Sequence, residues 1–248
     1  MGKQLESLYQ IALEAGEAIM ALYHSHVEVS EKDDRSPVTA ADLAANAIIL
    51  DKLAELTPDI PIVSEESAHI PWSERRNWQR FWLVDPLDGT KEYLRKNGEF
   101  TVNIALIEQG SPVMAVVHAP ALGKTWLGDG HQAWLVSKNK REEIKAKSAD
   151  KPVVVGSRSH PSPMMEEFLS KLPVYQLVAV GSSLKFCLVA EGGAQYYPRL
   201  GPTMMWDTAA GQCIAESAGA KVKALDGMPL RYDREELLNP HFIVSLPS

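Results

Sequence analysis

Two carboxylates three residues apart follow an apolar run, and their types and spacing could support metal chemistry. The run Trp82-Leu83-Val84 leads into Asp85-Pro86-Leu87-Asp88. Unpaired charge is costly beside a buried strand, and a turn that contains proline brings its first and fourth residues within about 7 Å. Two acids at that distance repel unless a cation or a proton lies between them. A divalent cation with oxygen ligands, Mg²⁺ or Mn²⁺, is the simplest solution, with the Leu87 carbonyl as a further ligand.

The residues after these acids suggest a place for an oxyanion. Gly89-Thr90 opens a predicted short helix over 90–94, and free N–H groups at a helix N-terminus favour phosphate. A metal site beside such groups predicts a phosphate-ester site, whereas a plain Asp turn with a Thr cap is the local alternative. The acids are one residue too far apart for an Asp-x-Asp phosphatase, and neither glycine-rich nucleotide motif occurs. Ser182-Ser183-Leu184-Lys185 matches an acyl-transfer motif, but its companion motifs are missing.

Other polar residues each have a simple local explanation. Asp42 is the third residue after Thr39 and fits a helix capping box. Glu65 follows a short predicted strand and could face water, and Asp207 fits the first turn of a helix. Lys185 and Arg199 could each be a surface charge.

The chain before residue 150 is predicted to hold two helices against a largely antiparallel sheet. Loops are expected at 30–37 and 69–80. The predicted helices cover 3–24 and 39–56, and the predicted strands cover 61–64, 81–84, 101–107, 112–118, 124–127 and 132–136.

A polar, charged stretch at 138–151 places a domain boundary near residue 150. Beyond it, strands alternate with helices, which favours an α/β half. The strands are expected at 153–155, 174–180, 194–197 and 242–244, and the helices at 161–172, 182–191 and 206–218. We therefore expect an N-terminal α+β half, 1–150, with most of the acids, and a C-terminal α/β half, 151–248.

Composition limits the function classes. The formal net charge is −7 over 248 residues, which argues against a nucleic-acid binder. The two cysteines, Cys187 and Cys213, lie in apolar helix-like segments and are expected to be buried thiols. No apolar run approaches the ~20 residues of a transmembrane helix, and no signal peptide is evident. These features predict a cytoplasmic protein.

Three segments together resemble the signatures of the inositol monophosphatase superfamily. They are Ser64-Glu65-Glu66-Ser67, Asp85 through Thr90, and Trp206-Asp207-Thr208-Ala209-Ala210-Gly211. Lys91-Glu92-Tyr93 after Thr90 resembles the bacterial 3'(2'),5'-bisphosphate nucleotidase branch, as does the segment 181–192. The resemblance implies a layered α-β-α-β-α sandwich of the inositol monophosphatase and fructose-bisphosphatase type, with the site between the halves.

The resemblance also implies a role for each candidate residue. The implied metal ligands are Glu65, Asp85, the Leu87 carbonyl, Asp88 and Asp207. The implied catalytic residues, which orient the attacking water, are Asp42, Glu65 and Thr90. The implied substrate contacts are Glu65, Gly89, Thr90, Lys91, His160, Ser182, Lys185, Arg199 and Asp207.

By resemblance, we expect a Mg²⁺-dependent phosphatase that removes the 3'-phosphate of adenosine 3',5'-bisphosphate (PAP). Two or three Mg²⁺ ions are implied, with Mn²⁺ as a substitute and Li⁺ and Ca²⁺ as inhibitors. Cleavage of the sulfated nucleotide PAPS to APS stays an open addition. The alternatives are an inositol or sugar monophosphatase on the same fold and a non-catalytic nucleotide-binding protein. A monomer or homodimer is expected, cytoplasmic or peripheral on the inner membrane.

Overall fold

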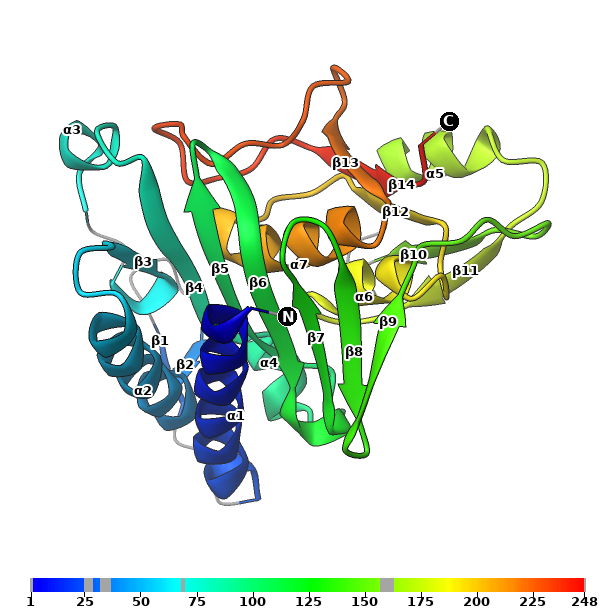
Figure 1. Cartoon of the computed structure of the whole chain (residues 1–248). Coiled ribbons are helices and arrows are strands. Elements are labelled where there is room, and N and C mark those ends of the chain that lie inside the picture. The colour runs from blue at the N-terminus through cyan, green and yellow to red at the C-terminus, as the bar shows by residue number, and fades with distance from the viewer. Residues whose placement is uncertain (1, 25–28, 32–36, 68–69, 157–162, 248) are drawn as a thin grey trace.

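A seven-stranded sheet and a five-stranded sheet form the frame of the molecule. The computed structural model describes residues 2–24, 29–31, 37–67, 70–156 and 163–247. The helices are α1 (Lys3–Tyr23), α2 (Ala40–Leu56), α3 (Trp72–Arg75), α4 (Thr90–Leu94), α5 (Pro163–Ser170), α6 (Leu184–Ala190) and α7 (Met205–Ser217). The strands are β1 (Val29–Glu31), β2 (Pro37–Thr39), β3 (Ile62–Ser64), β4 (Arg80–Asp88), β5 (Thr101–Glu108), β6 (Ser111–Ala119), β7 (Lys124–Gly128), β8 (Ala133–Ser137), β9 (Lys140–Ile144), β10 (Val153–Gly156), β11 (Gln176–Ala179), β12 (Tyr196–Arg199), β13 (Lys221–Ala224) and β14 (Phe242–Ser245). Figure 1 labels these elements.

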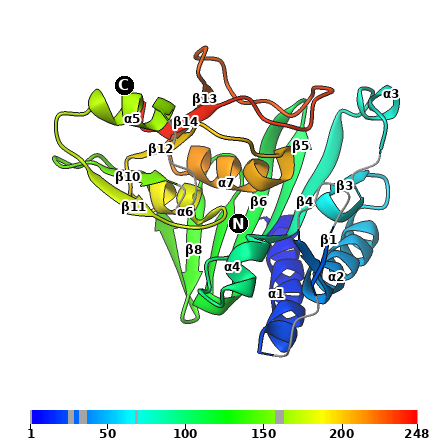
Figure 2. The same ribbon diagram turned by 180° about the vertical axis from the view of Figure 1, so that it is seen from behind.

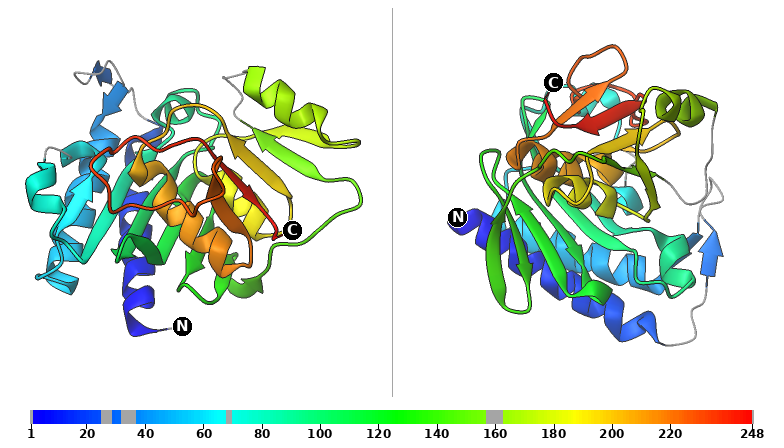
Figure 3. Two further views of the ribbon diagram at one scale, coloured as in Figure 1. Left: turned by 90° about the horizontal axis from the view of Figure 1, so that it is seen from above. Right: turned by 90° about the vertical axis from the view of Figure 1, so that its right-hand side faces the viewer.

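The elements stack in five layers. Helices α1 and α2 cover one face of the large sheet, and α6 and α7 lie between its other face and the small sheet (Figures 2 and 3). Helix α5 lies outside the small sheet, where the Phe168 ring meets the Tyr196 ring at 5.8 Å. The α-β-α-β-α sandwich expected from the sequence is confirmed.

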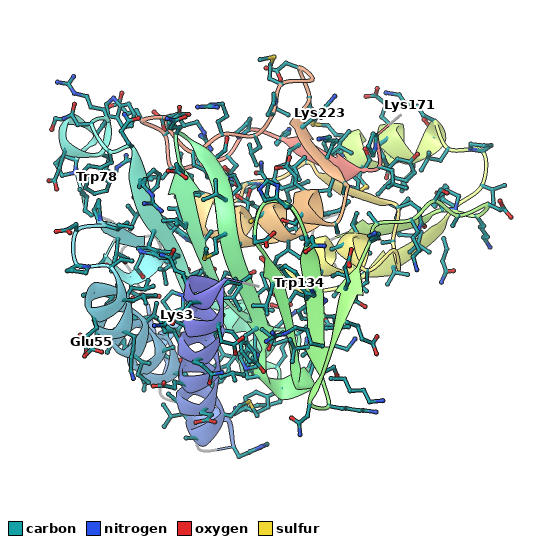
Figure 4. The ribbon with its side chains drawn as sticks, viewed as in Figure 1. Lys3, Glu55, Trp78, Trp134, Lys171 and Lys223 are labelled. Atoms are coloured by element: carbon teal, nitrogen blue, oxygen red, sulfur yellow. The ribbon has the colours of Figure 1, made fainter. Side chains whose placement is uncertain are left out.

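The large sheet is antiparallel except at one edge, as predicted. Its strand order is β3-β4-β5-β6-β7-β8-β9, and only β3 and β4 run parallel. Strand β4 is buried on both faces, which explains its unbroken apolar sequence. Trp82 and Val84 face the α1 and α2 side, whereas Phe81 and Leu83 face α7. Trp134 of β8, labelled in Figure 4, packs against the apolar cluster that contains Trp82 and Val84.

Helix α1 follows its predicted apolar stripe. Leu5, Leu8 and Ile19 are fully buried against the sheet. Gly16 lets the helix approach β6 closely, because a Cβ there would lie 2.5 Å from the His118 ring. Helices α1 and α2 therefore form a fixed layer behind strands β4 and β5.

The small sheet is mixed. Its order is β11-β10-β12-β14-β13, with β10 parallel to β11 and β12, and β14 antiparallel to β12 and β13. The predicted alternation of strands and helices is confirmed, although β12 begins at Tyr196 rather than at Ala194 and the helix predicted from 182 begins at Leu184.

Several expectations for polar segments were wrong. The expected loop at 69–80 contains α3, and the ends of the expected loop at 30–37 pair as β1 and β2. The charged stretch at 138–151 contains β9, and β13 was not predicted. Helix α3 has no buried residue and β9 is mostly exposed, so neither shows the apolar pattern of a buried element. Strand β13 does alternate but is only four residues long.

One apolar cluster joins the two sheets. It includes Phe81 and Ala105 of the large sheet, Ile214 of α7, and Val155 and Val244 of the small sheet. The division near residue 150 stays a prediction about folding units. Among the residues described above, no helix has the length and apolarity to cross a bilayer.

Candidate active site

Strand register brings the first two acids together. Ser64 of β3 lies opposite Val84 of the parallel strand β4, so the next residues, Glu65 at the end of β3 and Asp85 within β4, lie side by side. Glu65 begins a single 3₁₀ turn, and Asp85 is 1% exposed. The parallel pairing of β3 with β4 thus places two carboxylates together.

The third acid comes from the other side of the molecule. Helix α7 crosses the face of the large sheet and presents Asp207 in its first turn. Carboxylate oxygens of Glu65, Asp85 and Asp207 all lie within 4.8 Å of one another. Asp207 also accepts a hydrogen bond from the Met204 N–H at 2.8 Å, so the same carboxylate caps its helix.

The acidic cluster brings several negative charges together, and a bound cation would balance them. Burial raises the pKa of Asp85 well above its ordinary value, and the charges of Glu65, Asp88 and Asp207 raise it further. Burial, followed by the charge of Asp88, raises the pKa of Asp207 to about 8. A hard divalent cation would remove both penalties, and its preferred ligands are carboxylate oxygens. The donor set therefore fits Mg²⁺ or Mn²⁺.

Asp85 and Asp88 are held by an irregular end of β4. The pairing of β4 with β5 shifts between these two residues. The Leu87 N–H donates to Asp85 Oδ1 at 3.1 Å, which closes the turn. Gly89 follows with φ 93°, a left-handed conformation that glycine adopts without steric cost. Asp88 lies outside the close three-acid group, half-buried and lining the adjoining pocket.

Asp42 and Thr90 form the hydrogen-bonded pair that the resemblance implied. Thr90 Oγ1 donates to Asp42 Oδ1 at 3.2 Å, or to the Leu87 carbonyl at 3.5 Å. The other oxygen of Asp42 accepts from the Thr39 N–H at 2.8 Å and the Thr39 hydroxyl at 2.6 Å. The capping box of α2 is therefore present, and the same acid holds the Thr90 hydroxyl. Asp42 therefore belongs to the capping box of α2 and also accepts the hydrogen bond from Thr90.

A cavity of about 390 Å³ lies beside the acids. Its lining includes four basic side chains in addition to Asp88, Glu92 and Asp207. The basic residues are Lys91, Arg95, Lys185 and Arg199. The cavity therefore joins a carboxylate end, suited to a metal, with a cationic wall suited to an anion.

Lys185 and Arg199 are held from within the protein. Lys185 is 5% exposed and donates to the Ser182 carbonyl at 2.7 Å and the Val180 carbonyl at 3.2 Å. Burial lowers the pKa of Lys185 to about 8, although the charge of Asp88 opposes this shift. Arg199 donates to the Pro202 carbonyl, while its Nε is buried with no hydrogen-bond partner. Ser182 has φ 43°, a strained conformation that these contacts maintain.

The structure gathers most of the predicted residues into one place. The cavity is lined by seven of them: Asp88, Gly89, Lys91, Ser182, Lys185, Arg199 and Asp207. His160 lies outside the described residues. The sequence prediction missed Arg95, Asn103 and Ser183. Arg95 is three residues beyond Glu92 on one helical face, a spacing that could have indicated it.

Comparison with known proteins places the chain in a family. The model of the inositol monophosphatase family matches residues 3–244. The chain belongs to the inositol monophosphatase family. It is 53% identical to the 3'(2'),5'-bisphosphate nucleotidase CysQ of Salmonella typhimurium, over 98% of this chain and 99% of that protein. It is 51% identical to CysQ of Escherichia coli K12, with the same coverage.

Solved structures of the inositol monophosphatase family agree with this fold. CysQ from Bacteroides thetaiotaomicron superposes with a TM-score of 0.88 at 41% identity, covering 98% of this chain and 96% of that one. An inositol monophosphatase from Anabaena gives a TM-score of 0.75 at 25% identity, covering 97% and 89%. Proteins of this family are metal-dependent phosphatases, and the acidic cluster described above fits that chemistry.

Proposed function

We propose that this protein is a Mg²⁺-dependent phosphatase that converts adenosine 3',5'-bisphosphate to AMP and phosphate. The observation that carries this proposal is the close group of Glu65, Asp85 and Asp207 beside a cavity with a cationic wall. The CysQ relatives named above, at 51–53% identity, support this substrate over inositol phosphates. Cleavage of the sulfated nucleotide PAPS at the same bond is a second activity to test.

The acids would hold two metal ions. Glu65, Asp85 and the Leu87 carbonyl would hold one ion, and Asp85, Asp88 and Asp207 a second. Bound Mg²⁺ supplies a lowered water pKa and neutralises charge on the phosphate and the leaving oxygen. The buried carboxylates contribute by staying ionised once the cation balances them.

Thr90, hydrogen-bonded to Asp42, would help to accept the proton of the attacking water. Because Thr90 Oγ1 donates its own hydrogen to Asp42 at 3.2 Å, its oxygen lone pairs stay available as acceptors. Asp42 is kept in place by Thr39, so the Thr90 hydroxyl is fixed in one orientation. We assign Glu65 the task of aiming the same water from the opposite side.

The cationic wall would select the rest of the substrate. The Gly89 and Thr90 N–H groups would contact the phosphate that is cleaved, together with Lys91. Ser182, Lys185 and Arg199 also line the cavity and would contact the second phosphate or the ribose. An inositol ring with one phosphate would leave part of this positive charge without a partner.

Phosphate release from a panel of substrates tests the proposal. With Mg²⁺, PAP should be hydrolysed at least about tenfold more efficiently than inositol 1-phosphate, a difference of about 1.4 kcal/mol in transition-state binding. Asp88→Asn should lose about a hundredfold or more of the activity, because removing one charge-stabilising group typically costs this much. Asp51→Asn, an exposed site on α2, is the matched control.

Three results would contradict specific parts of the proposal. A preference for inositol 1-phosphate would overturn the substrate, and full activity in EDTA would overturn the metal mechanism. Nucleotide binding without turnover in any divalent cation would favour a binding protein. Mn²⁺ should replace Mg²⁺, whereas Li⁺ and Ca²⁺ should inhibit.

A further inference from the structure

A chain of buried hydrogen bonds connects Asp88 of the large sheet to Asp207 of α7. Asn103 Nδ2 lies 3.4 Å from Asp88 Oδ2 and donates to Ser183 Oγ at 3.0 Å. Ser183 Oγ in turn donates to the Asp207 carbonyl at 2.8 Å. Asn103 is 1% exposed and Ser183 is 2% exposed. Each hydroxyl and amide in this chain therefore has a protein partner rather than water.

A further contact orients the amide. Thr101 Oγ1 donates to Asn103 Oδ1 at 2.9 Å, which turns the Asn103 NH₂ group toward Asp88 and Ser183. Strand register explains the position, because Asn103 pairs with Asp85 and Thr101 with Asp88 across β4 and β5. Thr101 is fully buried, so the amide has little freedom to rotate.

We propose that Asn103 and Ser183 are positioning residues that hold Asp88 of β4 and Asp207 of α7 at the spacing required for a shared divalent cation. The inference rests on the metal site of the proposed function and assigns these two residues a role toward it. Partners that orient metal ligands typically change metal affinity 10–100-fold when they are removed. The chain Asp88–Asn103–Ser183–Asp207 is the direct polar link between a ligand on β4 and a ligand on α7.

Metal affinity in solution is the appropriate measurement, because it does not depend on turnover. Binding of Mn²⁺, and of Mg²⁺ by competition, is measured by electron paramagnetic resonance on the full chain. Asn103→Ala and Ser183→Ala should each weaken binding about tenfold or more. Ser183 also acts on Asp88 directly, through its N–H and its hydroxyl, so the double variant should bind Mn²⁺ more weakly than either single variant.

A matched control separates positioning from general loss of packing. Gln195 is a buried amide, 6% exposed, that donates to the Lys147 carbonyl at 2.9 Å and does not line the cavity. Gln195→Ala should lower stability and leave metal affinity within about twofold of the wild type. If Asn103→Ala does not fold, Thr101→Val retains Asn103 and Ser183 but removes the hydroxyl that orients the Asn103 amide, and it should still weaken Mn²⁺ binding.

The outcomes are decisive and separate from the proposed function. Unchanged Mn²⁺ affinity in a folded Asn103 or Thr101 variant overturns the inference. Weakened affinity supports it even if PAP proves not to be the substrate. Conversely, efficient hydrolysis of PAP by wild type with unchanged affinity in the variants would retain the proposed function and remove this role.

Discussion

Asp42 and Asp207 each serve as a helix cap and as a member of the candidate site. Asp42 accepts from the Thr39 N–H at the start of α2, and Asp207 accepts from the Met204 N–H at the start of α7. Caps of this kind contribute about 1 kcal/mol to stability. Each acid therefore caps its own helix and also contacts other residues of the candidate site. The capping role that the sequence suggested describes only part of what each acid does.

The raised pKa of Asp207 predicts how the metal-free protein responds to pH. Between the unfolded pKa near 4 and the folded pKa of about 8, the folded state binds a proton that the unfolded state does not. Stability should therefore fall as the pH rises through this range, by up to about 1.4 kcal/mol per pH unit for one group. Urea unfolding in EDTA between about pH 5 and pH 8 measures this slope.

Saturating Mg²⁺ is the control for this prediction. A bound cation keeps the carboxylates ionised, so the slope below about pH 8 should largely disappear. A metal-free protein whose stability is constant or rises over this range would show that Asp207 does not hold a proton there.

Helices and strands differ in how far their positions could be predicted. The apolar stripe of α1 and the Thr39–Asp42 spacing gave the two N-terminal helices, because both signals are local. Strand β9, with its charged residues 140–143, carries no apolar alternation, since it is an edge strand exposed along its length. The contact between Asn103 of β5 and Ser183, at the start of α6, joins residues far apart in the chain, and no periodicity in the sequence indicates it.

The close packing of α1 on β6 predicts the effect of a methyl group at Gly16. Alanine is worth about 1 kcal/mol more than glycine in a helix interior. However, a Cβ at Gly16 would lie 2.5 Å from His118 Cδ2 and 3.1 Å from Pro120 Cβ. Overpacking typically costs 1–3 kcal/mol, so Gly16→Ala should be destabilising by about 1 kcal/mol or more in urea unfolding.

A double-mutant cycle identifies the cause. In a His118→Ala background the ring is gone, and Gly16→Ala should become nearly neutral or stabilising. If Gly16→Ala costs the same in both backgrounds, the contact with His118 is not what constrains this position.

The molecule as a whole is tied together by α7, which packs on strands of both sheets. One face of the large sheet, including Phe81, Leu83 and Ala105, is covered by residues of the C-terminal part. A fragment of residues 1–150 would expose this face. We expect it to lack a cooperative unfolding transition, whereas the full chain should unfold in one step seen alike by fluorescence and circular dichroism.

Mixing the two fragments is the informative complement. If residues 151–248 restore a cooperative transition to 1–150, the sheets depend on each other for folding. A sharp transition in 1–150 by itself would instead establish the boundary near residue 150 as a division between independent folding units.

The order in which the acids occur along the chain has a consequence during protein synthesis. Glu65 and Asp85 leave the ribosome more than a hundred residues before Asp207. At roughly 5–20 residues per second, the nascent chain carries an incomplete acid cluster for several seconds. During that time neither Ser183 nor helix α7 has been synthesised, so the two carboxylates are without them. Catalytic competence is therefore acquired late, only after nearly the whole polypeptide has been made.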